Sequence, residues 1–89
     1  MKKDMNLVRL YEKEFGYGSW SATAGTTGTT GGDGSVTIVE FRTNSDFFDI
    51  QLVRDNDFNV MNITCVGDNE LTALIESIEF VLSKLKLNH

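Results

Sequence analysis

The sequence has 89 residues, and its 13 acidic and 8 basic side chains give a formal net charge of −5 at pH 7. A chain of this length typically forms one domain, so we expect residues 1–89 to fold as a single unit. The acidic balance argues against direct nucleic-acid binding, which depends largely on basic contacts to phosphate. No apolar run reaches the length of about 20 residues that a membrane helix needs, so we expect no membrane contact.

The N-terminal part of the chain predicts a helix, a strand and a loop. Residues 4–15 carry apolar side chains at helical spacing, and Gly16 suits the left-handed turn that ends a helix, so we expect a short N-terminal helix there. Residues 19–24 alternate polar and apolar side chains, which predicts a strand with Trp20 on its buried side. The Gly/Thr-rich stretch 25–34 predicts a flexible loop between two strands, for which a role in contacts stays open.

The rest of the chain predicts three strands and a long helix. Residues 35–43, 46–55 and 58–66 are rich in Val, Ile, Phe and Thr and are separated by polar turn residues, as strands are. Residues 69–87 predict an amphipathic helix, whose apolar stripe consists of Leu71, Leu74, Ile75, Ile78, Val81, Leu82 and Leu85. We therefore expect an α+β fold with a short N-terminal helix, a four-stranded antiparallel β-meander and a C-terminal helix packed on one sheet face.

Two tight turns define the strand register that we expect. Asn44-Ser45 and Asn56-Asp57 suit two-residue turns, because Asn and Asp tolerate the left-handed backbone that such turns need. The first turn would place Glu40 directly opposite Asp49. The second turn would form three cross-strand residue pairs on one apolar face, namely Phe48 with Cys65, Ile50 with Ile63, and Leu52 with Met61.

The negative charge is concentrated in one segment. Residues 43–70 hold six acids and one base, and this difference of five equals the net charge of the whole chain. In the expected register the acidic end of the sheet consists of Glu40, Asp46, Phe47, Asp49 and Glu70. Carboxylates around an exposed aromatic ring favour a basic partner. The opposing interpretation is that Glu40 and Asp49 both point into water and that Glu40 leans toward Arg42.

These observations lead to our first functional hypothesis. We expect a small, acidic, non-enzymatic protein-binding module or inhibitor, whose acidic sheet end docks on a basic surface of another protein. A nucleic-acid-binding surface, which the acidic end would block by mimicking DNA, is one such target. The composition is similar to that of small acidic inhibitors, such as phage proteins that mimic DNA, and of toxin-immunity proteins. No motif, however, indicates a named family.

A homodimer is the alternative hypothesis. Phe80 lies about half a turn away from the apolar stripe of its helix, and Ala73 and Leu87 share its side of the helix. These three residues would form a second seam that meets another copy of the chain. An exposed strand edge offers another route to the same assembly.

The sequence assigns no catalytic residue, cofactor or metal ligand. Residues 55–59 begin like a calcium-binding loop, but Val60 replaces the required glycine, which excludes an EF-hand. A looser divalent-cation site at Glu40, Asp46 and Asp49 is a weaker alternative. His89 is the only histidine and Cys65 is expected to face the core, so we expect neither a Ser–His nor a Cys–His pair, and no enzyme activity. The single cysteine and the lack of a signal-peptide pattern favour a reducing cytoplasm.

Overall fold

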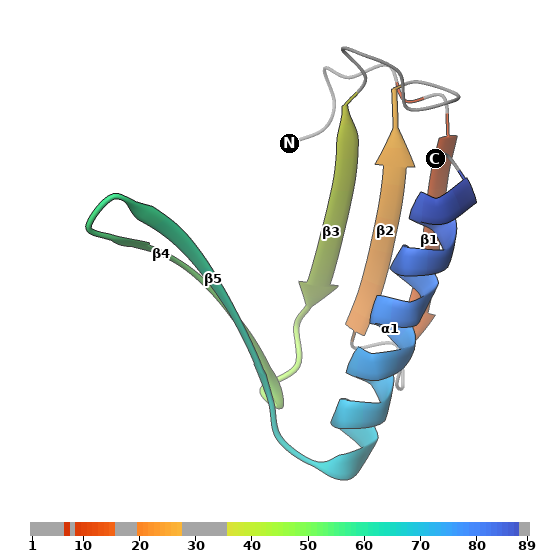
Figure 1. The fold of residues 1–89 in the computed structure, drawn as a ribbon. Helices are drawn as coiled ribbons and strands as arrows, with labels where there is room; N and C mark the ends of the chain where they lie inside the picture. The colour runs from red at the N-terminus through yellow and green to blue at the C-terminus, as the bar shows by residue number, and fades with distance from the viewer. Residues whose placement is uncertain (1–6, 8, 16–19, 28–35, 88–89) are drawn as a thin grey trace.

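The computed structural model describes residues 7, 9–15, 20–27 and 36–87, which form five strands and one helix (Figure 1). In chain order these are β1 (Arg9–Phe15), β2 (Trp20–Thr26), β3 (Thr37–Thr43), β4 (Phe48–Asp55), β5 (Phe58–Cys65) and α1 (Asp68–Leu87). The strands form two antiparallel sheets, one of order β1-β2-β3 and one that consists of the β4–β5 hairpin. The α+β class and the C-terminal helix are confirmed, but the four-stranded meander is wrong.

The helix expected over residues 4–15 is wrong, because residues 9–15 form strand β1. β1 pairs with β2 along its whole length, and Phe15 lies opposite Trp20. The spacing that suggested a helix explains the error. Tyr11 and Phe15 are four residues apart, and such residues share a face in a strand as well as in a helix. The first residues of the expected helix lie outside the described residues.

Strand β2 confirms the strand expected over residues 19–24 and extends it to Thr26. Just beyond β2, the backbone N–H of Thr27 donates to the carbonyl oxygen of Val36 at 3.0 Å, so the antiparallel contact between β2 and β3 continues past the strand end. Most of the expected Gly/Thr-rich loop, residues 28–34, lies outside the described residues.

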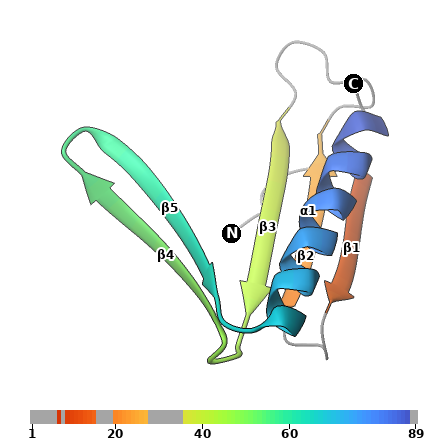
Figure 2. The ribbon, with the colours of Figure 1, turned by 60° about the horizontal axis from the view of Figure 1, so that its bottom comes forward.

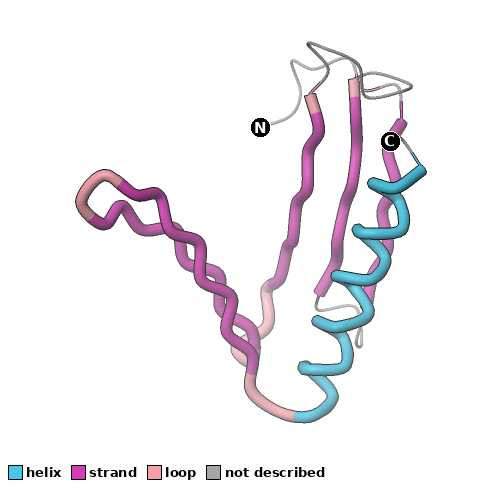
Figure 3. The backbone as a smooth tube through the Cα atoms, viewed as in Figure 1, coloured by secondary structure: helices cyan, strands magenta, loops and turns pink. Residues whose placement is uncertain are grey.

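Strands β3 and β4 are both fully described, and they do not pair with each other. Where a tight turn was expected at Asn44-Ser45, the chain bends instead. The backbone N–H of Ser45 donates to Thr43 Oγ1, and that of Phe47 donates to Ser45 Oγ, each at 3.1 Å. Both bonds hold the connection that Figure 3 shows between the two strands. The β4–β5 hairpin therefore diverges from the three-stranded sheet, as two views agree (Figures 1 and 2).

The second expected turn is confirmed. Asn56 has a φ of 55°, which is the left-handed conformation that Asn tolerates better than most residues. The hairpin register is the expected one, with Phe48 opposite Cys65, Ile50 opposite Ile63 and Leu52 opposite Met61.

Trp20 lies at the centre of the core that joins the two sheets and the helix. Its side chain is fully buried, and its indole Nε1 donates a hydrogen bond of 2.9 Å to Ser77 Oγ in α1. The ring stacks on Phe48 of β4 at a centroid distance of 4.6 Å and on Phe41 of β3 at 5.5 Å. The base of the hairpin is thus anchored in the same core that holds α1 on the sheet.

Helix α1 packs on the sheet with a face that only partly coincides with the expected apolar stripe. Of that stripe, Val81 is buried, and Leu74 and Leu85 pack against the core. The buried residues of the helix are Ala73, Ser77 and Val81. Four residues of the expected apolar stripe remain about half exposed, at 47 % for Leu71, 47 % for Ile75, 50 % for Ile78 and 51 % for Leu82. The small side chains of Ala73 and Ser77 leave room for the large indole, which explains why this narrow face packs against it.

Candidate protein-interaction surface

One face of the β4–β5 hairpin is apolar from its base to well beyond the core. Phe48 at the base is 5 % exposed, and Ile50 and Ile63 pack partly against the core. Two residues further along the same face, Leu52 is 79 % exposed and its cross-strand partner Met61 is 58 % exposed. Since alternate residues of a strand share a face, one continuous apolar face begins in the core and ends in solvent.

The other face and the tip of the hairpin are also rich in exposed apolar side chains. Val53 lies opposite Val60 on the second face and is 45 % exposed. Phe58, next to the turn, is 72 % exposed. Monomeric proteins rarely display large contiguous apolar patches unless the patch binds something. The outer half of the hairpin, residues 51–61, is therefore the candidate interaction surface, and we call it the hairpin arm.

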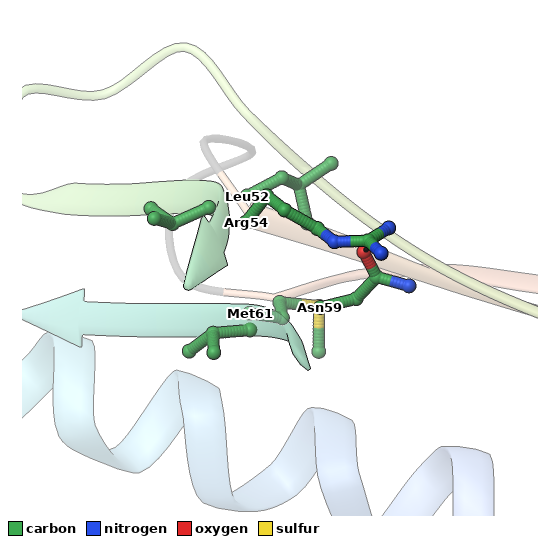
Figure 4. Close-up of a pocket in the computed structure, with 6 residues that line it drawn as sticks. Leu52, Arg54, Asn59 and Met61 are labelled. Atoms are coloured by element: carbon green, nitrogen blue, oxygen red, sulfur yellow. Dashed lines mark hydrogen bonds between the residues drawn. The ribbon is translucent and has the colours of Figure 1, made fainter. Parts of the chain in front are cut away.

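The hairpin arm contains a hollow of about 390 Å³ (Figure 4), which is lined by Leu52, Val53, Arg54, Asn59, Val60 and Met61. Arg54 Nη1 donates to Asn59 Oδ1 at 3.2 Å, and Arg54 Nε donates to the carbonyl oxygen of Asn56 at 3.5 Å. These bonds hold the guanidinium across the strands near the turn. The lining is mostly apolar and includes one cation, which suits contact with side chains of a partner.

Three residues of the predicted acidic site lie together at the base of the hairpin. Asp46 and Asp49 are exposed, and Phe47 between them is 56 % exposed. The backbone N–H of Val66 donates to the carbonyl oxygen of Phe47 at 2.9 Å, which places the 61 % exposed Val66 beside this aromatic residue. The exposed apolar pair flanked by carboxylates resembles the arrangement that the sequence predicts, although it is smaller.

Glu70 lies at the start of α1. The carbonyl oxygen of Gly67 accepts the N–H of Leu71 at 3.0 Å, so Gly67 occupies the N-cap position. Gly67 has a φ of 109°, and a Cβ there would clash with the Glu70 carboxylate. Glu70 therefore folds back over Gly67, one residue beyond Val66.

Glu40 does not belong to this acidic group. It lies in β3 opposite Thr23 of β2, and its carboxylate is 3.4 Å from Arg42 Nε with a side chain that is 17 % exposed. The expected pairing of Glu40 with Asp49 is wrong because β3 and β4 belong to different sheets. The interpretation in which Glu40 leans toward Arg42 agrees with the structure.

Two of the three residues predicted for self-association, Ala73 and Phe80, pack toward the sheet and are not available to a second copy. Ala73 is 3 % exposed, and the ring of Phe80 meets the ring of Phe15 edge-on at 5.8 Å. Leu87 is 58 % exposed. The exposed apolar side of α1 consists of four residues of the stripe that was expected to face the core, namely Leu71, Ile75, Ile78 and Leu82. The helical pattern shows two apolar faces, and only packing decides which of them meets the sheet.

Within the described residues, no three His, Cys, Asp or Glu side chains are grouped so that they could hold a metal ion. In the same ranges, no helix combines the length and the hydropathy that crossing a membrane requires. Cys65 is a half-buried free thiol. Comparison with protein-family models, with curated proteins and with solved structures finds no significant match to this chain.

Proposed function

We propose that the protein is a non-enzymatic protein-binding module and that its hairpin arm inserts into an apolar groove of a partner protein. The observation that carries this proposal is the exposure of Leu52, at 79 %, on a face whose other end is buried in the core. Moving such a side chain from water into a groove contributes about 25 cal/mol per Å² of apolar area, and the rigid base keeps the ordering cost low.

The charges around the hairpin define the rim of the groove that would accept it. β4 and its two flanking turns carry Asp46, Asp49, Asp55 and Asp57 against Arg54 alone. Four acids against one base favour a groove bordered by Lys and Arg side chains. At the base of the hairpin, Phe47 would serve as an apolar anchor between Asp46 and Asp49. A nucleic-acid-binding protein offers a basic surface of this kind, and the bound hairpin would block it, which makes the module an inhibitor.

The proposal places this binding in a reducing compartment such as the cytoplasm. The chain has a single cysteine, and Cys65 is a free thiol at the hairpin base. Structural disulfides are common in oxidising compartments, where small domains depend on them for stability. In this protein the aromatic stack around Trp20 would stabilise the small domain in place of a disulfide.

Comparative capture from a lysate of the native host tests the proposal. Immobilised wild-type chain is compared with Leu52→Asp/Met61→Asp, and Leu10→Asp, which replaces a 53 % exposed residue outside the hairpin, is the matched control. We expect one or more proteins to bind the wild type and the control and to be lost from the hairpin variant. Equal recovery by all three chains would contradict the proposal.

A further inference from the structure

Helix α1 carries a seam of apolar side chains that the fold leaves exposed. We call Leu71, Ile75, Ile78 and Leu82 the α1 seam; they follow one another at intervals of four, three and four residues. This alternation is the spacing at which two helices interlock in a coiled coil. Each of the four side chains is between 47 % and 51 % exposed, whereas the opposite side of the helix is buried on the sheet.

The α1 seam lies on the flank of the helix away from β1. On one flank of the helix, Phe80 packs against Phe15, and Lys84 Nζ lies 5.0 Å from the ring centroid of Tyr11; both contacts are with β1. The seam lies on the other flank, toward β3. A helix about 10 Å wide covers about two strands spaced 4.8 Å apart, so a three-stranded sheet leaves one strand open. Val39 of β3, which shares the face of Ala24, is accordingly 42 % exposed.

The charges at the two ends of the helix fit a second copy of the same chain. Asp68 and Lys86 are both exposed and lie 18 positions apart, which is five turns at 3.6 residues per turn, so both lie on the same line beside the seam. In an antiparallel pair of α1 helices, Leu71 meets Leu82 of the second copy, and Asp68 comes beside Lys86 of the second copy at both ends. A parallel pair would instead gather both Asp68 residues at one end and both Lys86 residues at the other, and would form neither contact between opposite charges.

The chain exposes more surface than a compact monomer of its mass. A compact monomer of this mass exposes about 5,200 Å², whereas the chain exposes 6474 Å². The protruding hairpin arm accounts for part of the difference of about 1,300 Å², and the half-exposed α1 seam contributes another part. The radius of gyration, 14.3 Å, is likewise larger than the value of about 12 Å expected for a compact domain of this length.

We propose that two copies of the chain form a twofold-symmetric dimer through antiparallel contact of their α1 seams. The contact is self-complementary, since the same four side chains lie on both sides of the axis. It also brings a second helix next to the uncovered side of β3. The hairpin arm stays outside this contact and remains available for a different partner, so the dimer and the proposed function are independent.

Sedimentation of the purified full-length chain tests the dimer. We expect the wild type to sediment at twice the chain mass of 9.9 kDa at micromolar concentration. Ile75→Glu/Ile78→Glu places four carboxylates in the interface and should raise the dimer Kd at least about 100-fold. Leu87→Glu, which changes an exposed Leu outside the seam, should remain a dimer. Circular dichroism confirms that each variant is folded. A wild-type monomer up to about 100 μM, well above the Kd range of stable dimers, overturns the proposal, as does a seam variant that dimerises normally.

Charge exchange tests the antiparallel orientation. Asp68→Lys and Lys86→Glu each turn both end contacts from attractive to repulsive, and each should weaken the dimer about tenfold. The double variant Asp68→Lys/Lys86→Glu restores opposite charges and should recover wild-type dimerisation. The same double variant has a cation at the N-terminus and an anion at the C-terminus of α1, which is the least favourable arrangement for the helix dipole. If Asp68 and Lys86 only stabilised the helix, this variant would therefore form the weakest dimer of the three. Dimerisation of both single variants at wild-type strength overturns the antiparallel arrangement.

Discussion

The indole Nε1 of Trp20 and the hydroxyl of Ser77 form a hydrogen bond of 2.9 Å between two side chains that are both fully buried. Ser77 in turn donates to the carbonyl oxygen of Leu74 at 2.8 Å, so the hydroxyl is both donor and acceptor. A buried indole N–H without a partner is costly, and only one rotation of α1 presents Ser77 to it. This bond therefore helps to determine that the α1 seam points away from the sheet.

Removing the serine hydroxyl should destabilise the fold. Ser77→Ala leaves the indole N–H without an acceptor and is expected to lower the free energy of unfolding by about 1–3 kcal/mol. Urea denaturation followed by tryptophan fluorescence measures this change. Ser83→Ala is the matched control, because Ser83 donates a similar bond to Phe80 at 2.8 Å on the exposed side of the same helix. Its effect should stay within about 0.5 kcal/mol, and an equal loss in both variants would argue against the buried bond.

The two aromatic ends of the hairpin should differ strongly in their effect on stability. Phe48→Ala removes the ring that stacks on Trp20 at 4.6 Å, and we expect a loss of about 3–5 kcal/mol. Phe58→Ala removes a ring that is 72 % exposed, so the free energy of unfolding should change by less than about 0.5 kcal/mol. Thermal unfolding of both variants measures the difference. Comparable losses would mean that the tip of the hairpin is packed in the core.

Gly67 should tolerate no other residue without strain. Its φ of 109° is disfavoured for a residue with a Cβ, and that Cβ would also displace the flexible Glu70 carboxylate. Gly67→Ala is expected to cost about 1–3 kcal/mol of unfolding free energy in chemical denaturation. In Gly67→Ala/Glu70→Ala the clash is relieved but the backbone strain remains, so we expect only partial recovery. Full recovery would show that the glycine serves only to make room for Glu70.

The acidic base of the hairpin should influence how fast a partner binds. Asp46→Lys/Asp49→Lys reverses two exposed charges, and we expect the association rate with a captured partner to fall about tenfold at low salt while the melting temperature stays unchanged. The rate for the wild type should also fall as salt is raised. Surface-based binding kinetics gives both numbers, with Glu12→Lys/Glu14→Lys, which reverses two exposed charges on β1, as the charge-matched control. An association rate that is indifferent to charge reversal and to salt would remove the acidic contacts from the proposal.

The sequence predicts the hairpin better than the arrangement around it. The register of β4 with β5 depends on a local turn, and Asn56 is a residue type that tolerates the left-handed backbone of that turn. The separation of β3 from β4 depends instead on the stacking of Phe48 on Trp20, two residues 28 positions apart, which no local pattern reveals. Because β3 and β4 are separate, Glu40 does not lie beside Asp46 and Asp49, contrary to the prediction from the sequence.

The rotation of α1 could not be predicted from hydrophobicity alone. The apolar stripe holds the larger side chains, and the rule that apolar faces are buried assigns that stripe to the core. Close approach to a tryptophan ring instead favours the face with Ala73 and Ser77, because these side chains are small. Ser77 also offers an acceptor for the indole N–H. The burial of this polar residue can therefore be predicted only when the position of Trp20 is known.

Hydrogen–deuterium exchange of the wild-type chain, free and bound to a captured partner, tests the role of the hairpin arm most directly. Exchange is slowed where an amide is buried or bonded, so the location of protection reveals the contact. We predict that binding protects amides within residues 51–61 and leaves those of β1 unchanged. Protection confined to β1, β2 or the α1 seam, with no change in the arm, would contradict the proposed binding surface.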